Sequence, residues 1–308
     1  MSGGLSVPDW QPAPPLQALY LDWLSEAGVE AAVLRLDLID PLISGNKWFK
    51  LKPHLEAAAL AGARGLMSLG GAHSNHLHAL AAAGRRFDFP TVGLVRGHPQ
   101  RTATIEDLEN FGMHLHWLGY GGYRARHEPD FWQRWKELYP GLQPVPEGGG
   151  GLLGAQGCAP LVNVVQQQLA ALGWDDYHGW WLAAGTGTTL AGLALAESGM
   201  HPVYGALAVP ANHGVEDQVE SIFREAGRGL RDYQLLDASQ GGFATVDQPL
   251  LEFLHASEAQ SGLPLEPLYT GKALMALRNE VQAGRFAAGT RLVFVHTGGL
   301  QGRRGFLV

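Results

Sequence analysis

Lys47 is the residue in this sequence of 308 whose type and setting are most suggestive of chemistry. It follows the turn pair Gly45-Asn46 and precedes an apolar stretch that we expect to be helical over Pro53–Ala61. A lysine at such a turn can be partly buried, and burial lowers the pKa of its amine and makes it a usable nucleophile or base. A Schiff base with a carbonyl ligand needs an amine of this kind. Taken alone, the Gly-Asn-Lys sequence favours a solvated surface lysine, and the other turns of the chain change that interpretation.

A second turn, Gly70-Gly71-Ala72-His73-Ser74-Asn75-His76, joins an expected strand to an expected helix over Ser74–Arg86. Ser74 stands where an N-cap is expected. Its hydroxyl, the Asn75 amide and the free N–H groups of the helix start would form a cradle for the carboxylate of a small acid. Ordinary helix capping explains the serine equally well.

A third turn, Gly185-Thr186-Gly187-Thr188-Thr189, lies between an expected strand and an expected helix. Backbone donors, hydroxyls and the positive end of the helix suit a phosphate there. The turn is not a Walker A motif, and Leu190 stands where a dinucleotide fingerprint has its third glycine. We therefore expect a phosphate without a dinucleotide. A fourth turn, His296-Thr297-Gly298-Gly299, would let a flat ligand approach closely. The Thr297 hydroxyl could then hydrogen-bond a heteroatom of the ligand's ring.

Composition excludes several other classes of protein. The chain is 46% hydrophobic with a net charge of −7, which supports a large core and speaks against nucleic acid as a partner. We expect no signal peptide, no membrane span and a cytoplasmic location, and the single cysteine, Cys158, fits a reducing compartment. His73, His76 and His78 lack the spacing of a ligand set, so we expect no metal.

The elements that must position these turns alternate between strand-like and helix-like stretches, which predicts parallel sheets with helices on both faces. We expect a helical patch over Leu16–Ala27, a helix over Ala159–Leu172 and a long loop over Tyr139–Gly157 that acts as a domain junction or a lid. The pair Trp180-Trp181 is expected to be buried strand core. Because ligands bind at the carboxyl ends of parallel strands, the turns can converge on one site.

A reactive lysine, a phosphate turn and a carboxylate cradle together point to pyridoxal phosphate, which has an aldehyde, a phosphate and a ring nitrogen. The sequence also resembles the 1-aminocyclopropane-1-carboxylate deaminase/D-cysteine desulfhydrase group of fold-type II pyridoxal-phosphate enzymes. The resemblance runs from about Pro14 to the C-terminus. It is carried by five motifs in the group's order, namely Ser44-Gly45-Asn46-Lys47…Lys50-Leu51, Gly70 to His76, Gly185 to Thr189, Tyr269-Thr270-Gly271-Lys272 and His296 to Gly299.

The resemblance implies an α/β fold of two open parallel-sheet, three-layer domains, similar to tryptophan synthase β. Residues 53–157 would form a smaller domain that contributes the Ser74/Asn75 turn, and 1–52 with 158–308 a larger cofactor-binding domain. Homodimers are usual in the resembled group, so we expect one here. The only other partner expected is a small amino-acid substrate.

The resemblance also assigns cofactor contacts. Lys47 would hold the cofactor as a Schiff base and move protons at the substrate α-carbon. Lys50 would lie near the phosphate, which the motif Gly185 to Thr189 would bind, and Asn75 would lie beside the 3-hydroxyl. The cofactor contacts are completed by Thr270 and Thr297.

Substrate contacts are implied in the same way. Ser74 would take part in catalysis and, with Asn75 and His76, hold the substrate carboxylate. Tyr269 would lie near the reacting carbon. Phe243 falls in the region where ring-opening enzymes of the group carry a second tyrosine.

Departures from the group's pattern decide the expected reaction. Ring-opening enzymes carry glutamate where this chain has Thr270 and leucine where it has Thr297. The group's usual glutamine is His73 here, and an acidic residue expected near Arg35 is Leu36. A carboxylate facing the ring nitrogen favours a pyridinium and a strong electron sink, whereas a threonine leaves the ring neutral.

A weaker sink suffices when a good leaving group departs from the β-carbon. We therefore predict β-elimination from a small amino acid such as D-cysteine, giving pyruvate, ammonia and sulfide. The alternative within the class is ring-opening deamination of 1-aminocyclopropane-1-carboxylate. Two other classes stay open, a nicotinamide oxidoreductase that uses Gly185–Gly187 and a non-catalytic protein that binds a phosphate ligand.

Overall fold

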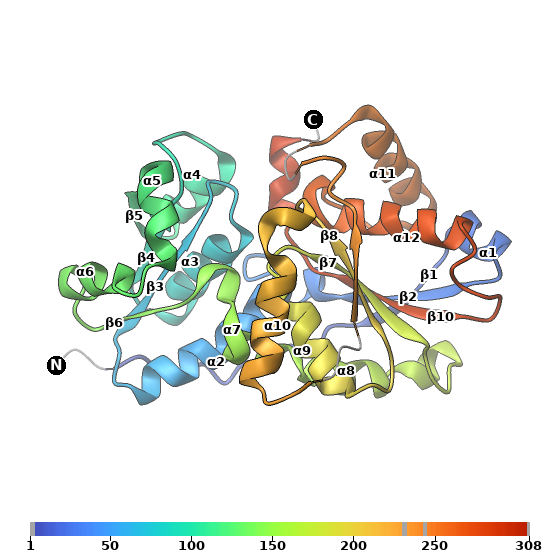
Figure 1. The fold of residues 1–308 in the computed structure, drawn as a ribbon, viewed down its shortest axis with the longest axis horizontal. Coiled ribbons are helices and arrows are strands. Elements are labelled where there is room, and N and C mark those ends of the chain that lie inside the picture. Colours follow the sequence, from blue (N-terminus) through green and yellow to red (C-terminus); the bar gives the residue numbers. More distant parts are fainter. Residues whose placement is uncertain (1–3, 230–232, 243–244, 307–308) are drawn as a thin grey trace.

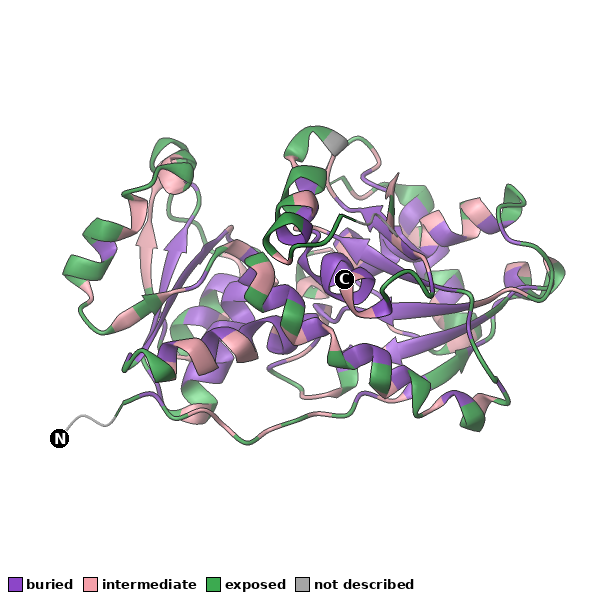
Figure 2. Cartoon of the chain, turned by 60° about the horizontal axis from the view of Figure 1, so that its bottom comes forward, coloured by how far each residue is buried: buried purple, intermediate pink, exposed green. Residues whose placement is uncertain are grey.

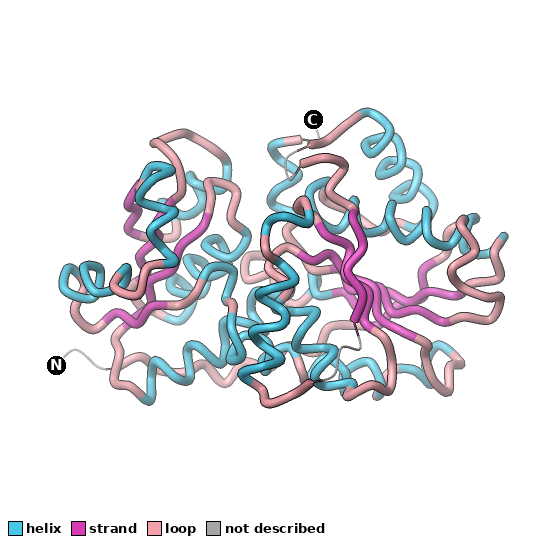
Figure 3. The backbone as a smooth tube through the Cα atoms, viewed as in Figure 1, coloured by secondary structure: helices cyan, strands magenta, loops and turns pink. Residues whose placement is uncertain are grey.

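A computed structural model describes residues 4–229, 233–242 and 245–306 of the chain. Two β-sheets lie side by side, each with helices packed around it (Figure 1). Figure 3 shows the two groups of strands separated by helices and loops. In the described residues, no helix has both the length and the apolar character that crossing a membrane requires.

The larger sheet has six strands in the order β1-β2-β10-β7-β8-β9, and only β1 runs antiparallel to its neighbour. Its strands are β1 (Leu16–Leu19), β2 (Glu30–Arg35), β7 (Gly179–Ala184), β8 (Val203–Leu207), β9 (Tyr233–Asp237) and β10 (Arg291–His296). Strand β7 is buried along its whole length, as expected for a parallel strand covered on both faces. Trp180 packs in the core on one face and Trp181 in the core on the other, because successive side chains of a strand point to opposite faces. The prediction that both are buried core is confirmed.

The smaller sheet has four parallel strands in the order β5-β4-β3-β6. They are β3 (Gly65–Gly70), β4 (Thr91–Val95), β5 (His114–Trp117) and β6 (Leu142–Pro144). This sheet has apolar cores of its own, and Figure 2 shows that the strands and inward helix faces are buried while outer helix faces are exposed.

Twelve α-helices occur in the described residues. They are α1 (Asp22–Glu26), α2 (Asn46–Leu60), α3 (Asn75–Phe87), α4 (Ala103–Asn110), α5 (Gly119–Arg124), α6 (Phe131–Leu138), α7 (Gly151–Cys158), α8 (Pro160–Gln166), α9 (Thr188–Glu197), α10 (Val215–Glu225), α11 (Gln248–Ser261) and α12 (Lys272–Gln282). Short helical turns complete the chain at η1 (Leu36–Leu38), η2 (Ala125–His127), η3 (Glu147–Gly149), η4 (Leu169–Leu172), η5 (Ala211–His213), η6 (Pro267–Gly271) and η7 (Leu300–Gly305).

Helix α2 begins seven residues earlier than we expected from the sequence, so Lys47 lies inside the helix and Pro53 lies in its interior. Pro53 cannot donate to the carbonyl of Phe49. Gly157 of α7 packs on that carbonyl so closely that a Cβ on residue 157 would come within 1.9 Å of the Phe49 oxygen. The close contact between the two helices therefore occurs where the proline leaves a carbonyl free.

Three other expectations about elements are wrong. Residues Leu16–Leu19 form strand β1, paired with β2, and not a helix continuing to Ala27. The stretch Tyr139–Gly157 is not one loop, since it contains β6, η3 and most of α7. The helix expected over Ala159–Leu172 is divided into α8 and η4. The sequence also gave no sign of the edge strand β9, whose residues are only half-buried or exposed.

The predicted domain boundaries fall within helix α2, at 52/53, and at the last residue of α7, at 157/158. These two helices pack against each other (Figure 1). The division into 53–157 and the rest stays a prediction, with the smaller sheet formed by strands inside that range.

Candidate active site

The turn that precedes α2 is joined to the end of strand β10. Gly45 has φ +82°, and a Cβ there would lie 2.1 Å from the carbonyl oxygen of Thr297. Only glycine combines this backbone conformation with such close approach. The Asn46 N–H donates to the same oxygen at 3.2 Å. Two motifs that are about 250 residues apart in the sequence thus form one structural unit.

Lys47 is the second residue of α2, half-buried, and its Nζ donates to Asn46 Oδ1 at 2.8 Å. Burial lowers the pKa of the Lys47 amine to about 8, against the opposing effect of Cys158 and Glu266. The lowered pKa makes the neutral, nucleophilic form of the amine accessible near physiological pH.

Lys50 and His76 lie next to each other beside the glycine-rich turn η3. A Cβ on Gly149 would lie 3.1 Å from Lys50 Cβ and 3.4 Å from His76 Cε1, so this glycine fills the gap between them. Both side chains are buried, and burial, followed by the charge of neighbouring lysines, holds both pKa values well below their usual range.

The hydrogen bonds of His76 define its tautomer. Ser68 Oγ donates to Val145 O at 2.8 Å and lies 2.9 Å from His76 Nε2, so Nε2 donates to Ser68. Nδ1 therefore carries a lone pair, and it is buried without a hydrogen-bond partner among the described residues. A buried unpartnered nitrogen at this position is ready to contact a ligand.

Ser74 caps helix α3, as predicted, by accepting a hydrogen bond from the N–H of Leu77 at 3.2 Å. Asn75, the first residue of α3, reaches the turn after β10. Its Oδ1 accepts from Gln301 Nε2 at 2.8 Å, and a Cβ on Gly299 would lie 2.6 Å from its Nδ2. The expected carboxylate cradle therefore lies against the turn that contains Thr297.

The Gly/Thr turn joins β7 to helix α9, and Gly187 is the N-cap with φ +71°. Thr189 Oγ1 accepts from Asn46 Nδ2 at 2.8 Å, which connects this turn to the residue before Lys47. Thr186 and Thr188 are linked through their hydroxyls at 3.1 Å, and a Cβ on Gly148 would lie 2.8 Å from Thr186 Cγ2. The N-terminus of a ten-residue helix with hydroxyls around it is suited to an anion.

Tyr269 and Thr270 lie in the single π-helical turn η6, which Glu266 caps. The buried Glu266 carboxylate accepts from the backbone N–H groups of Leu268, Tyr269 and Thr270 at 2.8, 2.7 and 2.6 Å. Burial raises the pKa of Glu266 to about 7, although these hydrogen bonds oppose the rise. Sequence reasoning did not single out Glu266; the signal available was an acidic residue directly before a proline at a helix start.

Tyr269 packs over the Gly/Thr turn, where a Cβ on Gly185 would lie 3.0 Å from Tyr269 Cε1. Thr270 is fully buried, and its hydroxyl accepts from the Glu266 N–H at 3.0 Å and lies 3.3 Å from Glu266 O. Glu266 thus holds the backbone of Tyr269 and both the backbone and the hydroxyl of Thr270.

Behind Thr297, His296 is buried with Nε2 donating to Pro264 O at 2.7 Å. Asp37 lies 3.3 Å from His296 Nδ1 and accepts two hydrogen bonds from Arg35, at 2.9 and 2.7 Å. The resemblance led us to expect an acidic residue near Arg35, where position 36 is leucine. In the structure Asp37 is the acidic residue that pairs with Arg35.

The remaining sequence candidates take different positions. His73 is exposed, and His78 is paired with Asp107 at 3.1 Å, away from His76. Cys158 is buried, with Sγ 3.9 Å from Thr189 Oγ1, and burial raises the pKa of its thiol to about 11. Phe243 lies outside the described residues.

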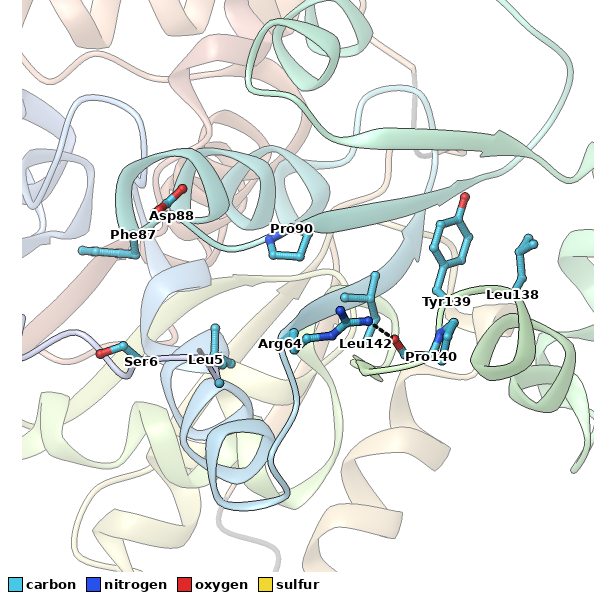
Figure 4. A pocket seen from close by; sticks show the side chains of 11 residues that line it. Leu5, Ser6, Arg64, Phe87, Asp88, Pro90, Leu138, Tyr139, Pro140 and Leu142 are labelled. Atoms are coloured by element: carbon cyan, nitrogen blue, oxygen red, sulfur yellow. Dashed lines mark hydrogen bonds between the residues drawn. The ribbon is translucent and has the colours of Figure 1, made fainter. Parts of the chain in front are cut away.

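A separate cavity of about 590 Å³ opens at the amino-terminal ends of β3 and β4, beside Arg64 and Pro90 (Figure 4). The turns after β3, β7 and β10 lie at carboxyl ends of strands, so this cavity is at the opposite edge of its sheet. None of the predicted site residues lines it.

Comparisons with known proteins agree with this arrangement. The family described as pyridoxal-phosphate dependent enzyme matches residues 11–298. A putative 1-aminocyclopropane-1-carboxylate deaminase from Thermotoga maritima is 28% identical over 311 residues, which cover 94% of this chain and 95% of the relative. A bifunctional D-cysteine desulfhydrase/1-aminocyclopropane-1-carboxylate deaminase from Arabidopsis thaliana is 27% identical over 302 residues, which cover 89% of this chain and 73% of the relative. The crystal structure of an ACC deaminase homologue superposes with a TM-score of 0.81 at 23% identity, covering 98% of this chain and 93% of the other, so the folds are alike.

Proposed function

Since the chain belongs to the family of pyridoxal-phosphate-dependent enzymes, we propose that it eliminates the β-substituent of a small amino acid such as D-cysteine, giving pyruvate, ammonia and sulfide. The observation that carries this choice is the pair Thr270 and Thr297, which stand where ring-opening members of the resembled group have glutamate and leucine. Curated relatives named for D-cysteine desulfhydrase and 1-aminocyclopropane-1-carboxylate deaminase activities support the class of reaction.

The residues present fit the cofactor. Lys47 offers an amine of lowered pKa, and the turn before α9 offers hydroxyls and N–H groups to a phosphate. The lack of a side chain at Gly185 leaves room for Tyr269 against that turn. Lys50 and His76 lie against Gly149 of η3, whose neighbour Gly148 lies against Thr186 of the turn. When bound, pyridoxal phosphate supplies an aldehyde that accepts an amine and a ring that withdraws electrons from the substrate α-carbon.

The chain's own residues then have the following roles. Lys47 removes the proton from the substrate α-carbon, which allows the β-substituent to leave. Ser74 and Asn75 donate hydrogen bonds to the substrate carboxylate. His76, which lies beside Lys50, contacts the substrate through Nδ1, whose lone pair accepts a hydrogen bond from an N–H or O–H group. Burial, reinforced by Glu266, raises the pKa of the Tyr269 hydroxyl, so it stays protonated and acts as a hydrogen-bond donor near the reacting carbon.

The two threonines have different roles in this proposal. The Thr270 hydroxyl is engaged with Glu266, at 3.0 Å from its N–H and 3.3 Å from its carbonyl oxygen. Thr297 follows strand β10 and lies against Gly45, two residues before Lys47. We therefore propose that the Thr297 hydroxyl hydrogen-bonds the ring nitrogen of the cofactor. A hydroxyl there leaves the ring neutral, which suits a substrate with a good leaving group.

We also propose that the enzyme is a cytoplasmic homodimer in which residues 53–157 form the smaller domain. The buried, unpaired Cys158 suits a reducing compartment. The separate apolar cores of the two sheets support the division into domains. Light scattering that gives about twice the 33.1 kDa chain mass would support the dimer.

The proposed reaction is tested with a panel of small D- and L-amino acids and 1-aminocyclopropane-1-carboxylate, with the keto acid identified in each assay. We expect pyruvate and sulfide from D-cysteine, and no keto acid from a matched Lys47→Ala preparation. Faster turnover of the cyclopropane substrate, with 2-oxobutyrate as product, would overturn β-elimination in favour of ring opening.

A pH dependence follows from the lowered pKa of Lys47. Uptake of pyridoxal phosphate by the apoprotein requires the neutral amine, whose fraction rises as the pH passes the pKa. The uptake rate should therefore increase with pH and level off above about 8, whereas an ordinary lysine, with a pKa of 10.5, would keep the rate rising. Stopped-flow absorbance from pH 6 to 10 measures the uptake rate. Nα-acetyl-lysine, which keeps a free side-chain amine, is the control for the cofactor's own ionisation.

A further inference from the structure

Gln301 lies in the C-terminal turn η7, directly after the turn that contains Thr297, and it contacts the other side of the site. Its Nε2 donates to Asn75 Oδ1 at 2.8 Å, between residues separated by 226 positions in the sequence. Both side chains are half-buried. No other hydrogen bond of Asn75 through its side chain is found in the part of the chain that the structure describes.

This hydrogen bond, with Gln301 as donor and Asn75 as acceptor, gives the orientation of the Asn75 amide in the structure. An asparagine side chain has one oxygen that accepts and one NH2 group that donates, and its orientation is assigned from its hydrogen-bond partners. Because Oδ1 accepts from Gln301, the NH2 group points away from Gln301. It lies at Gly299, where a Cβ would be 2.6 Å from Nδ2.

The segment that carries Gln301 is anchored on both sides. Arg303 makes two hydrogen bonds to Glu258 of α11, at 3.0 and 2.8 Å. Arg304 pairs with Asp107 of α4, and Asp107 also contacts His78 of α3 at 3.1 Å. Two residues that follow Gln301 thus join its segment to helices beside both sheets, which limits where Gln301 can lie relative to α3.

We propose that Gln301 is a positioning residue that holds the Asn75 amide with its NH2 group toward the bound cofactor. The proposal rests on the proposed function and on the contact between Asn75 and the 3-oxygen of pyridoxal phosphate that the family resemblance implies. An oxygen acceptor needs the NH2 group and not Oδ1. Without a donor at position 301 the amide is free to turn, and the cofactor meets an acceptor in a fraction of molecules.

The test uses variants that differ in what position 301 offers to Asn75. Gln301→Leu removes the donor without adding charge, and Gln301→Glu offers only acceptors, which favours the reversed amide. The dissociation constant of pyridoxal phosphate is measured by fluorescence titration of each apoprotein, and the apoprotein melting temperature is measured alongside. We expect binding to weaken about threefold in the Leu variant and about tenfold in the Glu variant, as the loss of one hydrogen bond predicts, with little change in melting temperature.

Arg303→Ala is the matched control, because it releases the same segment from α11 without touching Asn75. We expect its affinity for the cofactor to stay within about twofold of the parent, since only a half-buried ion pair outside the site is lost. In an Asn75→Ala background, Gln301→Leu should have no further effect, because coupled residues are not additive.

Three results would overturn the proposal. The first is unchanged affinity in both Gln301 variants, and the second is an equal loss in Arg303→Ala. The third is full additivity of the Asn75 and Gln301 changes. The measurement uses cofactor binding and no substrate, so it stays informative if the proposed reaction on D-cysteine is wrong.

Discussion

Replacing Lys47 by alanine should lower the rate of keto-acid formation by about 10³-fold or more, since a positioned acid–base group alone contributes about 10² to 10⁴-fold. Lys47 provides both the amine that holds the cofactor and the group that moves the α-proton, so both functions are lost together. Its half-buried position and its pKa of about 8 are what make one residue suitable for both. The measurement is keto-acid release under saturating substrate and cofactor.

Lys52→Ala is the matched control on the same helix. Lys52 pairs with Glu56 one turn further along α2, and both side chains are partly exposed. We expect activity within about twofold of the parent, because such exposed pairs contribute little. Borohydride treatment of the loaded protein should leave the cofactor on the peptide containing Lys47. Retention of a tenth of the activity in Lys47→Ala, or trapping on another peptide, would show that the assignment is wrong.

Gly45→Ala should destabilise the apoprotein by about 2 to 6 kcal/mol. Two costs add here: about 1 to 3 kcal/mol for an L-residue at φ +82° and ψ −167°, a conformation that essentially only glycine adopts, and about 1 to 3 kcal/mol for overpacking. The second arises because the new Cβ would lie 2.1 Å from Thr297 O and 2.9 Å from Gly298 Cα. The Asn46–Thr297 contact at 3.2 Å would open, and Lys47 would move with it. Urea unfolding of the apoprotein measures the loss.

Gly62→Ala is the control for the backbone term. Gly62 follows the other end of α2 with φ +71°, and a Cβ there has nothing within 4 Å. It should therefore cost only the conformational strain, about 1 to 2 kcal/mol. Equal losses in the two variants would mean that the turn at Gly45 relaxes away from β10 at no cost, and the close approach would then not be a stability determinant.

The parts of the site that could be predicted from the sequence are those defined by neighbouring residues. Ser74 was expected as an N-cap because a short hydroxyl side chain after a glycine turn caps the helix that follows, and it does so. The Gly/Thr turn was expected between a strand and a helix because apolar stretches on both sides marked those elements, and it joins β7 to α9.

The errors came where contacts distant in sequence overrode local preference. Leu16–Leu19 reads as helical with the residues that follow, but pairing with β2 makes it a strand. Pro53 predicts a helix start at that residue, because proline disfavours helix interiors. In the folded chain, the carbonyl that it leaves unpaired packs against Gly157 of α7, so the helix continues through it.

The sequence by itself determined the α/β class, through its alternating strand-like and helix-like stretches, and the resemblance to a pyridoxal-phosphate family, through five motifs in order. Each motif is a short turn whose chemistry depends on adjacent residues. Only the tertiary structure decided that Glu266 caps the turn of Tyr269 and Thr270, that Asp37 is the partner of Arg35 and His296, and that Gln301 holds Asn75. The physical reason is that a hydrogen bond across 226 residues depends on which strand ends meet at one edge of the fold, and periodicity and spacing along the chain do not encode that meeting point.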